Sequence, residues 1–122
     1  MNVVINVQTD AEFMRLLTPS SSMIITKHPN GEVSLGYDNN GIIIFNTGLS
    51  DEPFYAFDRT CPHDIATGVA LDLDGSVARC PVCKSEFLLP SEGLPAKGSV
   101  SKYYMKKYRA TYYGNGDLHI YN

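Results

Sequence analysis

Two short motifs, Thr60-Cys61-Pro62-His63 and, after sixteen intervening residues, Cys80-Pro81-Val82-Cys83, decide how this chain can fold. Each motif places two soft or borderline metal ligands close together on a segment that contains proline. A tight loop points both side chains of such a pair the same way, and proline stiffens that loop because its ring fixes φ. The motifs therefore indicate a metal centre held between two loops, with Cys61, His63, Cys80 and Cys83 as candidate ligands.

The residues alone leave three other interpretations open. The four groups could bind structural zinc as a Cys₃His set, although Cys-x-His is tighter than the spacer of most zinc modules. Cys80 and Cys83 could instead form a disulfide in an exported protein, which would leave Cys61 as a core residue. The motifs could also have lost their metal and bind no cofactor. Each of these would make the chain a non-redox module with a structural or interaction role.

The segment between the motifs predicts a β-hairpin. Asp74-Gly75 is a strong signal for a two-residue turn, and it separates the strand-like segments Val69–Leu73 and Ser76–Arg79. Such a hairpin would bring the two motifs side by side.

Further short segments rich in β-branched and aromatic residues extend in both directions from the motifs. A short helix near residues 10–17 is also expected, because Thr9-Asp10-Ala11-Glu12 resembles a capping box. Many short strands with little helix predict an all-β fold, a small antiparallel sandwich or barrel. The remaining predicted strands are 1–7, 23–26, 42–45, 54–57, 87–89, 103–113 and 118–121.

Length and composition fit one domain spanning residues 1–122. The net charge of −3 gives no overall attraction to nucleic acid, and no apolar run approaches the ~20 residues that cross a bilayer. The first residues lack the pattern of a signal peptide. We therefore expect a cytoplasmic location if Met1 is the natural start, and an exported protein if an N-terminal signal has been removed.

The two motifs and their surroundings resemble those of Rieske iron–sulfur proteins. Residues 54–63 look like the first box of that family, in which an apolar strand leads into a Cys-x-His loop, and residues 80–87 look like the second box. The likeness extends over about residues 42–122. It implies a Rieske-type fold, with cluster-binding loops at about residues 58–99 inserted in a β base. It also implies a [2Fe–2S] cluster, with Cys61 and Cys80 on one iron and His63 on the other.

The chain departs from the family pattern at three positions. Cys83 stands where the family has its second histidine, Lys84 where it has glycine, and Ser99 where the covering loop usually has proline. Thiolates are the usual ligands of such clusters, so Cys83 can still bind iron. Three further residues are expected to lie next to the ligands: Ser85 as a hydroxyl donor to a cluster sulfur or as a solvated loop residue, Phe87 in the core, and Lys84 at the surface.

The implied function is transfer of single electrons between redox partners that the sequence does not identify. No catalytic constellation stands out, so we expect an electron-transfer protein or redox subunit rather than a self-contained enzyme. Half of the ten basic residues lie between 97 and 109, interleaved with tyrosines. The negative net charge favours a half-solvated sheet face over a nucleic-acid surface, and a docking patch for an acidic redox partner is a third interpretation.

Overall fold

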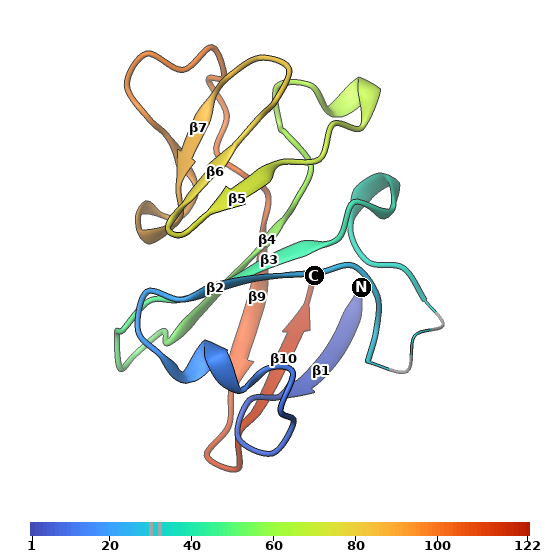
Figure 1. Ribbon diagram of the computed structural model, residues 1–122, viewed down its shortest axis with the longest axis vertical. Coiled ribbons are helices and arrows are strands. Elements are labelled where there is room, and N and C mark those ends of the chain that lie inside the picture. The colour runs from blue at the N-terminus through green and yellow to red at the C-terminus, as the bar shows by residue number, and fades with distance from the viewer. Residues whose placement is uncertain (30, 32) are drawn as a thin grey trace.

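The computed structural model describes residues 1–29, 31 and 33–122, and it consists of two antiparallel sheets (Figure 1). The larger sheet has the strand order β1-β10-β9-β4-β3-β2, and the smaller one has the order β5-β6-β7-β8. The first sheet comprises β1 (Asn2–Asn6), β2 (Ser22–Ile25), β3 (Ile42–Asn46), β4 (Phe54–Asp58), β9 (Lys107–Tyr112) and β10 (Asp117–Tyr121). The second comprises β5 (Asp72–Asp74), β6 (Val77–Arg79), β7 (Glu86–Leu88) and β8 (Leu94–Pro95). The all-β prediction is therefore confirmed.

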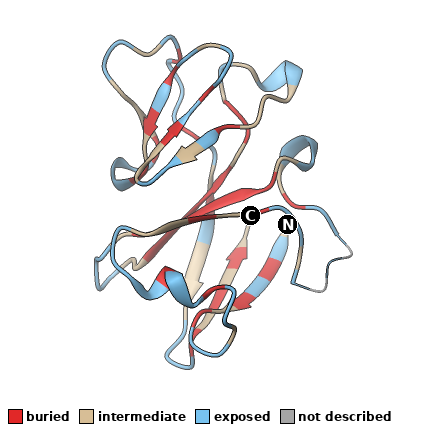
Figure 2. Ribbon diagram, viewed as in Figure 1, coloured by how far each residue is buried: buried red, intermediate tan, exposed pale blue. Residues whose placement is uncertain are grey.

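Strands β3 and β4 separate two hydrophobic cores. Every residue of both strands is buried (Figure 2), and side chains alternate between the two faces as the strand period of two requires. Ile42 and Ile44 face the core of the larger sheet, whereas Ile43 and Phe45 face a second core beneath the smaller sheet. Cys61 and Cys80 belong to that second core, so the candidate ligands are anchored in packed structure.

The smaller sheet is built from chain that leaves the larger sheet after β4 and returns to it at β9, the strand that pairs with β4. In Figure 1 the two sheets lie one above the other, and the loops that carry the cysteine motifs lie at the end away from the β9–β10 hairpin. The hairpin between the motifs is present, with β5 paired to β6. Its strands begin at Asp72 rather than at Val69, because residues 69–71 bond to the first motif's loop instead.

The expected helix near residues 10–17 is wrong beyond a single 3₁₀ turn, η1 (Met14–Leu17). Asn6 Oδ1 accepts hydrogen bonds from the backbone N–H groups of Gln8 and Thr9, so the chain is still turning where an α-helix would have to begin. Thr18 is extended and Pro19 follows it, so the helical turn cannot continue past Leu17. The other 3₁₀ turns are η2 (Tyr37–Asn39), η3 (Ile65–Thr67) and η4 (Leu89–Ser91).

Gly93 sits where the chain turns from η4 into β8 and packs against the larger sheet. Its φ is +78°, and a Cβ at this position would lie 2.8 Å from the Cβ of Met105 and 3.2 Å from the ring of Phe57. Glycine is required here both for its backbone conformation and for the close approach. Within the described part of the chain, no helix has the length and apolar character needed to cross a membrane.

Candidate metal centre

The first motif lies on a loop that leaves β4 and is held by the backbone on both sides. The N–H of Cys61 donates to the carbonyl of Val69 (2.8 Å), and the N–H of Leu71 donates to the carbonyl of Arg59 (2.7 Å). The Asn40 side chain adds a hydrogen bond of 2.8 Å to the carbonyl of Gly68. This loop, residues 59–68, is called the first loop below.

The second motif forms a tight turn between β6 and β7, which is called the second loop (residues 80–85). The N–H of Cys80 donates to the carbonyl of Ser85 (2.9 Å), and the N–H of Lys84 donates to the carbonyl of Cys80 (3.0 Å). Lys84 adopts the left-handed conformation with φ +63°, which explains why glycine would suit this position. Its exposed side chain reaches back to the carbonyl of Pro81 at 2.7 Å.

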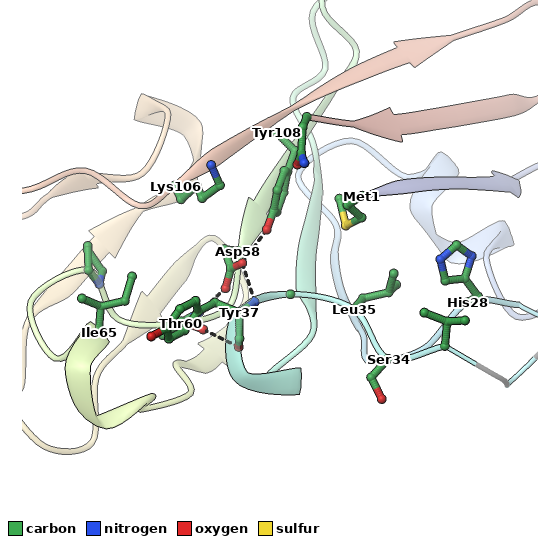
Figure 3. A pocket seen from close by; sticks show the side chains of 14 residues that line it. Met1, His28, Ser34, Leu35, Tyr37, Asp58, Thr60, Ile65, Lys106 and Tyr108 are labelled. Atoms are coloured by element: carbon green, nitrogen blue, oxygen red, sulfur yellow. Dashed lines mark hydrogen bonds between the residues drawn. The ribbon is translucent and has the colours of Figure 1, made fainter.

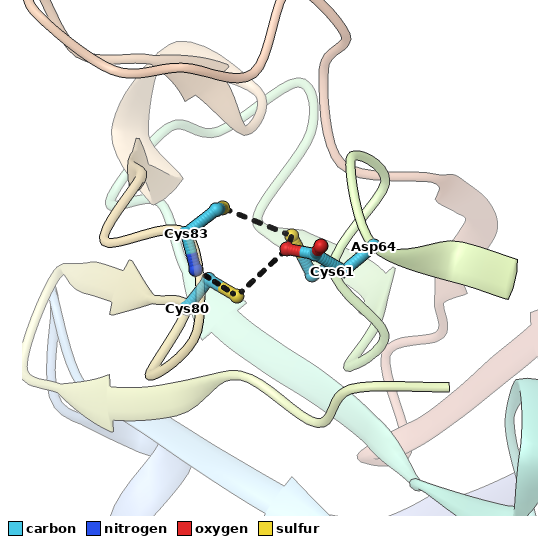
Figure 4. A group of neighbouring side chains, drawn as sticks. All are labelled: Cys61, Asp64, Cys80 and Cys83. Atoms are coloured by element: carbon cyan, nitrogen blue, oxygen red, sulfur yellow. Dashed lines mark hydrogen bonds between the residues drawn. The ribbon is translucent and has the colours of Figure 1, made fainter. Parts of the chain in front are cut away.

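The two loops bring the three cysteine side chains together (Figure 4). All three thiols are free, and the Sγ atoms of Cys61 and Cys83 lie 3.8 Å apart. Cys61 and Cys80 are fully buried, whereas Cys83 is half-buried. The backbone N–H of Cys83 points at the Sγ of Cys80 at 3.5 Å, a contact that favours the charged thiolate form.

The fourth side chain of this cluster is Asp64, not His63. Asp64 Oδ2 accepts hydrogen bonds from the thiols of Cys61 (3.6 Å) and Cys80 (3.4 Å). One ligand atom from each of Cys61, Asp64, Cys80 and Cys83 lies within 4.8 Å of the other three. His63 is exposed and stands outside this group.

A sequence signal for Asp64 was present in the first motif. Cys61-Pro62-His63-Asp64 and Cys80-Pro81-Val82-Cys83 share the pattern Cys-Pro-x-ligand. Asp64 therefore occupies in the first loop the position that Cys83 occupies in the second.

Electrostatics at the cluster depend on burial and on the contacts between its members. Burial raises the pKa of the Cys61 and Cys80 thiols. Contacts with the thiols, that of Cys83 foremost, lower the pKa of the Asp64 carboxyl. A bound cation would offset the cost of charging the buried sulfurs, because a thiol that coordinates a metal is deprotonated.

Ser85, the last residue of the second loop, and Phe87, just after it, are fixed in place. Ser85 is fully buried, so the interpretation of it as a solvated loop residue is wrong. Its Oγ accepts a hydrogen bond from the backbone N–H of Ser101 (2.9 Å) and contacts the Sγ of Cys83 at 3.2 Å. Phe87 is fully buried in the second core, as its strand position predicted.

The donor set fits an iron–sulfur cluster in its chemistry. Three thiols meet between the two loops, and His63 extends from the first of them. Thiolates and imidazole are the ligands on which protein-bound clusters depend.

A cavity of about 410 Å³ is lined in part by Thr60, Pro62 and Ile65 of the first loop (Figure 3). Asp58 and Tyr108 line it, together with apolar side chains such as Leu35 and Ile65. Asp58 is buried and accepts hydrogen bonds from the Tyr37 N–H and the Tyr108 hydroxyl. Its carboxylate is therefore occupied in holding the structure together.

Comparisons with known proteins place the fold but not the family. No protein-family model and no curated protein matches the sequence. Among solved structures, the ferredoxin of Sphingomonas yanoikuyae B1 is similar, with a TM-score of 0.52 and 16% identity over 86% of this chain and 88% of that one. A chain in the complex of reduced oxygenase and oxidized ferredoxin of carbazole 1,9a-dioxygenase has a TM-score of 0.52 and 18% identity, covering 85% of this chain and 82% of that one.

A larger protein shares the same architecture in part of its length. The apo form of the quaternary ammonium Rieske monooxygenase CntA superimposes with a TM-score of 0.61 and 19% identity. The match covers 98% of this chain and 32% of the monooxygenase, so the chain spans about a third of that protein. Two antiparallel sheets, two cysteine-bearing loops at one end of the smaller sheet, and these structural neighbours lead to one conclusion: the chain has a Rieske-type β fold.

Proposed function

We propose that the chain binds a [2Fe–2S] cluster between the first and second loops and passes single electrons between partner proteins. The observation that carries the proposal is the meeting of three free thiols from two loops in a Rieske-type fold. Cys61, Cys80, Cys83 and His63 would hold the cluster, which supplies one-electron redox chemistry when bound.

The chain's own residues would shape that centre in different ways. Cys61 and Cys80 are buried and fixed by backbone hydrogen bonds, so they would anchor the cluster on the protein side. His63 is exposed, so its imidazole would face the partner and could exchange a proton with solvent. The buried hydroxyl of Ser85 is placed to bond the sulfur of Cys83.

The third thiolate would lower the reduction potential. Two ferric ions, two sulfides and two thiolates sum to zero charge, and the thiolate of Cys83 makes the oxidised centre −1. Adding an electron to a negative centre is less favourable than adding one to a neutral centre. The potential is therefore expected below that of ordinary Rieske centres, which lie at about −150 to +300 mV.

The surface beside the loops suits a partner with an acidic, partly apolar face. Val82 is 62% exposed between the second loop's cysteines, and Val100 is exposed beside Ser101, which bonds to Ser85. The exposed side chains of Lys84 and Lys102 add positive charge next to these apolar groups, although the chain as a whole is negative. Opposite charges on a partner would accelerate the encounter.

The test is anaerobic purification followed by iron and acid-labile sulfide analysis, visible absorption, and EPR of the reduced protein. A bound cluster would give two irons and two sulfides per chain with an EPR signal altered in His63→Ala. The matched control is His119→Ala, because His119 lies on β10 in the larger sheet, remote from both loops. Absence of iron and sulfide after reconstitution would overturn the proposal. An unchanged EPR signal in His63→Ala would show that His63 is not a ligand.

A further inference from the structure

One ligand atom from each of Cys61, Asp64, Cys80 and Cys83 lies within 4.8 Å of the other three, close enough for a single ion to contact all four. We propose that the chain, when it carries no cluster, binds a single zinc-type divalent cation through these four residues. The inference concerns a ligand set that differs from that of the proposed cluster, since Asp64 replaces His63. It does not depend on the proposed function.

Three of the six distances between the ligand atoms are close to those of a tetrahedral zinc site, and the other three are within 4.8 Å. Zinc–sulfur bonds of about 2.3 Å and zinc–oxygen bonds of about 2.0 Å, set at tetrahedral angles, separate two sulfurs by about 3.8 Å and a sulfur from an oxygen by about 3.5 Å. The Sγ atoms of Cys61 and Cys83 lie 3.8 Å apart. Asp64 Oδ2 lies 3.6 Å from the Sγ of Cys61 and 3.4 Å from that of Cys80.

The two loops contribute to the site in the same way. Each supplies a cysteine followed by proline and, three residues after the cysteine, a second donor, which is Asp64 in the first loop and Cys83 in the second. This two-residue spacer lies within the spacing usual for structural zinc sites. The Cys61-x-His63 pair does not have that spacing.

A single ion would draw its donors around one point, whereas a binuclear cluster divides them between two irons. In the family pattern Cys61 and Cys80 share one iron, whereas the position of Cys83 belongs to the other. Here Cys61 and Cys83 touch, which places both sulfurs around one point. A single ion would therefore use Asp64 beside these sulfurs, and the exposed His63 would take no part.

Burial of two of the thiols supports a closed, structural site. Cys61 and Cys80 are completely buried, because both lie in the second core. Binding would release the three thiol protons to solvent, because the thiolates are the ligands. The backbone N–H of Cys83, which points at the Sγ of Cys80, offsets part of the remaining negative charge.

Cobalt(II) is the probe that tests the proposal, because its visible spectrum reports coordination. Metal-free reduced protein would be titrated with Co²⁺ and then with Zn²⁺ as a competitor, for the wild type, Asp64→Ala and His63→Ala. We expect one equivalent of Co²⁺ with an intense tetrahedral spectrum and sulfur-to-cobalt charge transfer. Asp64→Ala should weaken binding at least about tenfold, and His63→Ala should leave it unchanged.

Further measurements keep the outcomes separate. Thermal melting of each metal-free variant shows whether Asp64→Ala still folds, and Asp64→Asn provides a second variant of nearly the same shape. Loss of affinity in His63→Ala with none in either Asp64 variant would overturn the proposal, as would an octahedral spectrum. Iron, sulfide and EPR analysis of separately reconstituted samples tests the cluster, so either idea can fail while the other stands.

Discussion

The hydroxyl of Tyr108 donates a 2.5 Å hydrogen bond to the carboxylate of Asp58. Both residues are buried, and the bond joins β9 to the end of β4, from which the first loop departs. Asp58 also accepts hydrogen bonds from the N–H groups of Tyr37 and Thr60. The carboxylate therefore joins β9, the segment at Tyr37 and the start of the first loop (Figure 3).

Removing the Tyr108 hydroxyl should destabilise the fold. In Tyr108→Phe the buried Asp58 carboxylate loses one partner, a loss that costs about 1–3 kcal/mol. The free energy of unfolding, from denaturant titration followed by circular dichroism, measures the effect. Tyr103→Phe is the matched control, because the Tyr103 side chain is 66% exposed and should be close to neutral. Equal stability of the two variants would contradict the assigned role.

Stability should also fall at high pH because of the same tyrosine. Burial, followed by the Asp58 carboxylate, raises the pKa of Tyr108 above its ordinary value of 10.0. Above about pH 10 the unfolded chain loses the phenol proton while the folded chain keeps it, so unfolding becomes more favourable as pH rises. The denaturant concentration at the midpoint of unfolding should fall between pH 8 and pH 11, and it should fall less steeply in Tyr108→Phe than in the wild type. Identical slopes in both proteins would rule out this contribution.

Substitution of Gly93 should be more costly than substitution of another left-handed glycine. Gly93→Ala combines backbone strain of about 1–2 kcal/mol with overpacking of about 1–3 kcal/mol against Met105 and Phe57. Gly75→Ala shares the positive φ but meets nothing within 4 Å, so it should show the strain alone. Thermal melting of both variants isolates the packing contribution, and no difference between them would refute it.

Glycine at position 84 should stabilise the second loop. Lys84 adopts φ +63°, and relief of that strain in Lys84→Gly is worth about 1 kcal/mol, less the exposed hydrogen bond to Pro81. Lys102→Gly would control for the loss of a charged side chain at an exposed position. A higher melting temperature of Lys84→Gly than of the wild type is expected. A lower one would mean that the Lys84–Pro81 contact outweighs the strain.

Restoring a histidine at the second motif should raise the reduction potential of a cluster-bearing sample. Cys83→His removes one negative charge from the centre, so reduction becomes easier. Voltammetry should give the wild type a potential nearer the roughly −400 mV of all-cysteine ferredoxins. It should give Cys83→His a higher potential, toward the Rieske range of about −150 to +300 mV. Ser99→Pro serves as a control, because it restores the proline that the family usually has in the covering loop and leaves the ligand charge unchanged. A potential unaffected by Cys83→His would show that Cys83 does not bind iron.

Most strands could be predicted because their patterns are local. Residues 42–45 and 54–57 read as strands from β-branched and aromatic content, and β3 and β4 cover them. The Asp74-Gly75 turn was predicted one residue early, since the loop residues are Gly75 and Ser76. The predicted strand 103–113 begins only at Lys107. The chain before it is held by the side chain of Ser85, a contact between distant residues that no local pattern reports.

The candidate site could be predicted in its cysteines but not in its fourth member. Cys61, Cys80 and Cys83 stood out by their clustering in the sequence, and the structure brings their sulfurs together. Aspartate is common at protein surfaces, so the one sequence signal for Asp64 was its spacing from Cys61, which matches that of Cys83 from Cys80. The Asp64 side chain turns inward because the first loop is closed by backbone bonds on both sides of it, which only the folded chain reveals.

Because β3 and β4 are shared between two cores, loss of a bound metal would affect the packing of the chain as well as its redox chemistry. If the emptied loops loosened, the inner face made by Ile43, Phe45 and Phe57 would open to water. Such a surface is prone to association with other chains. A metal bound between the loops, as proposed above, would then also keep this apolar face covered and so oppose aggregation of the chain.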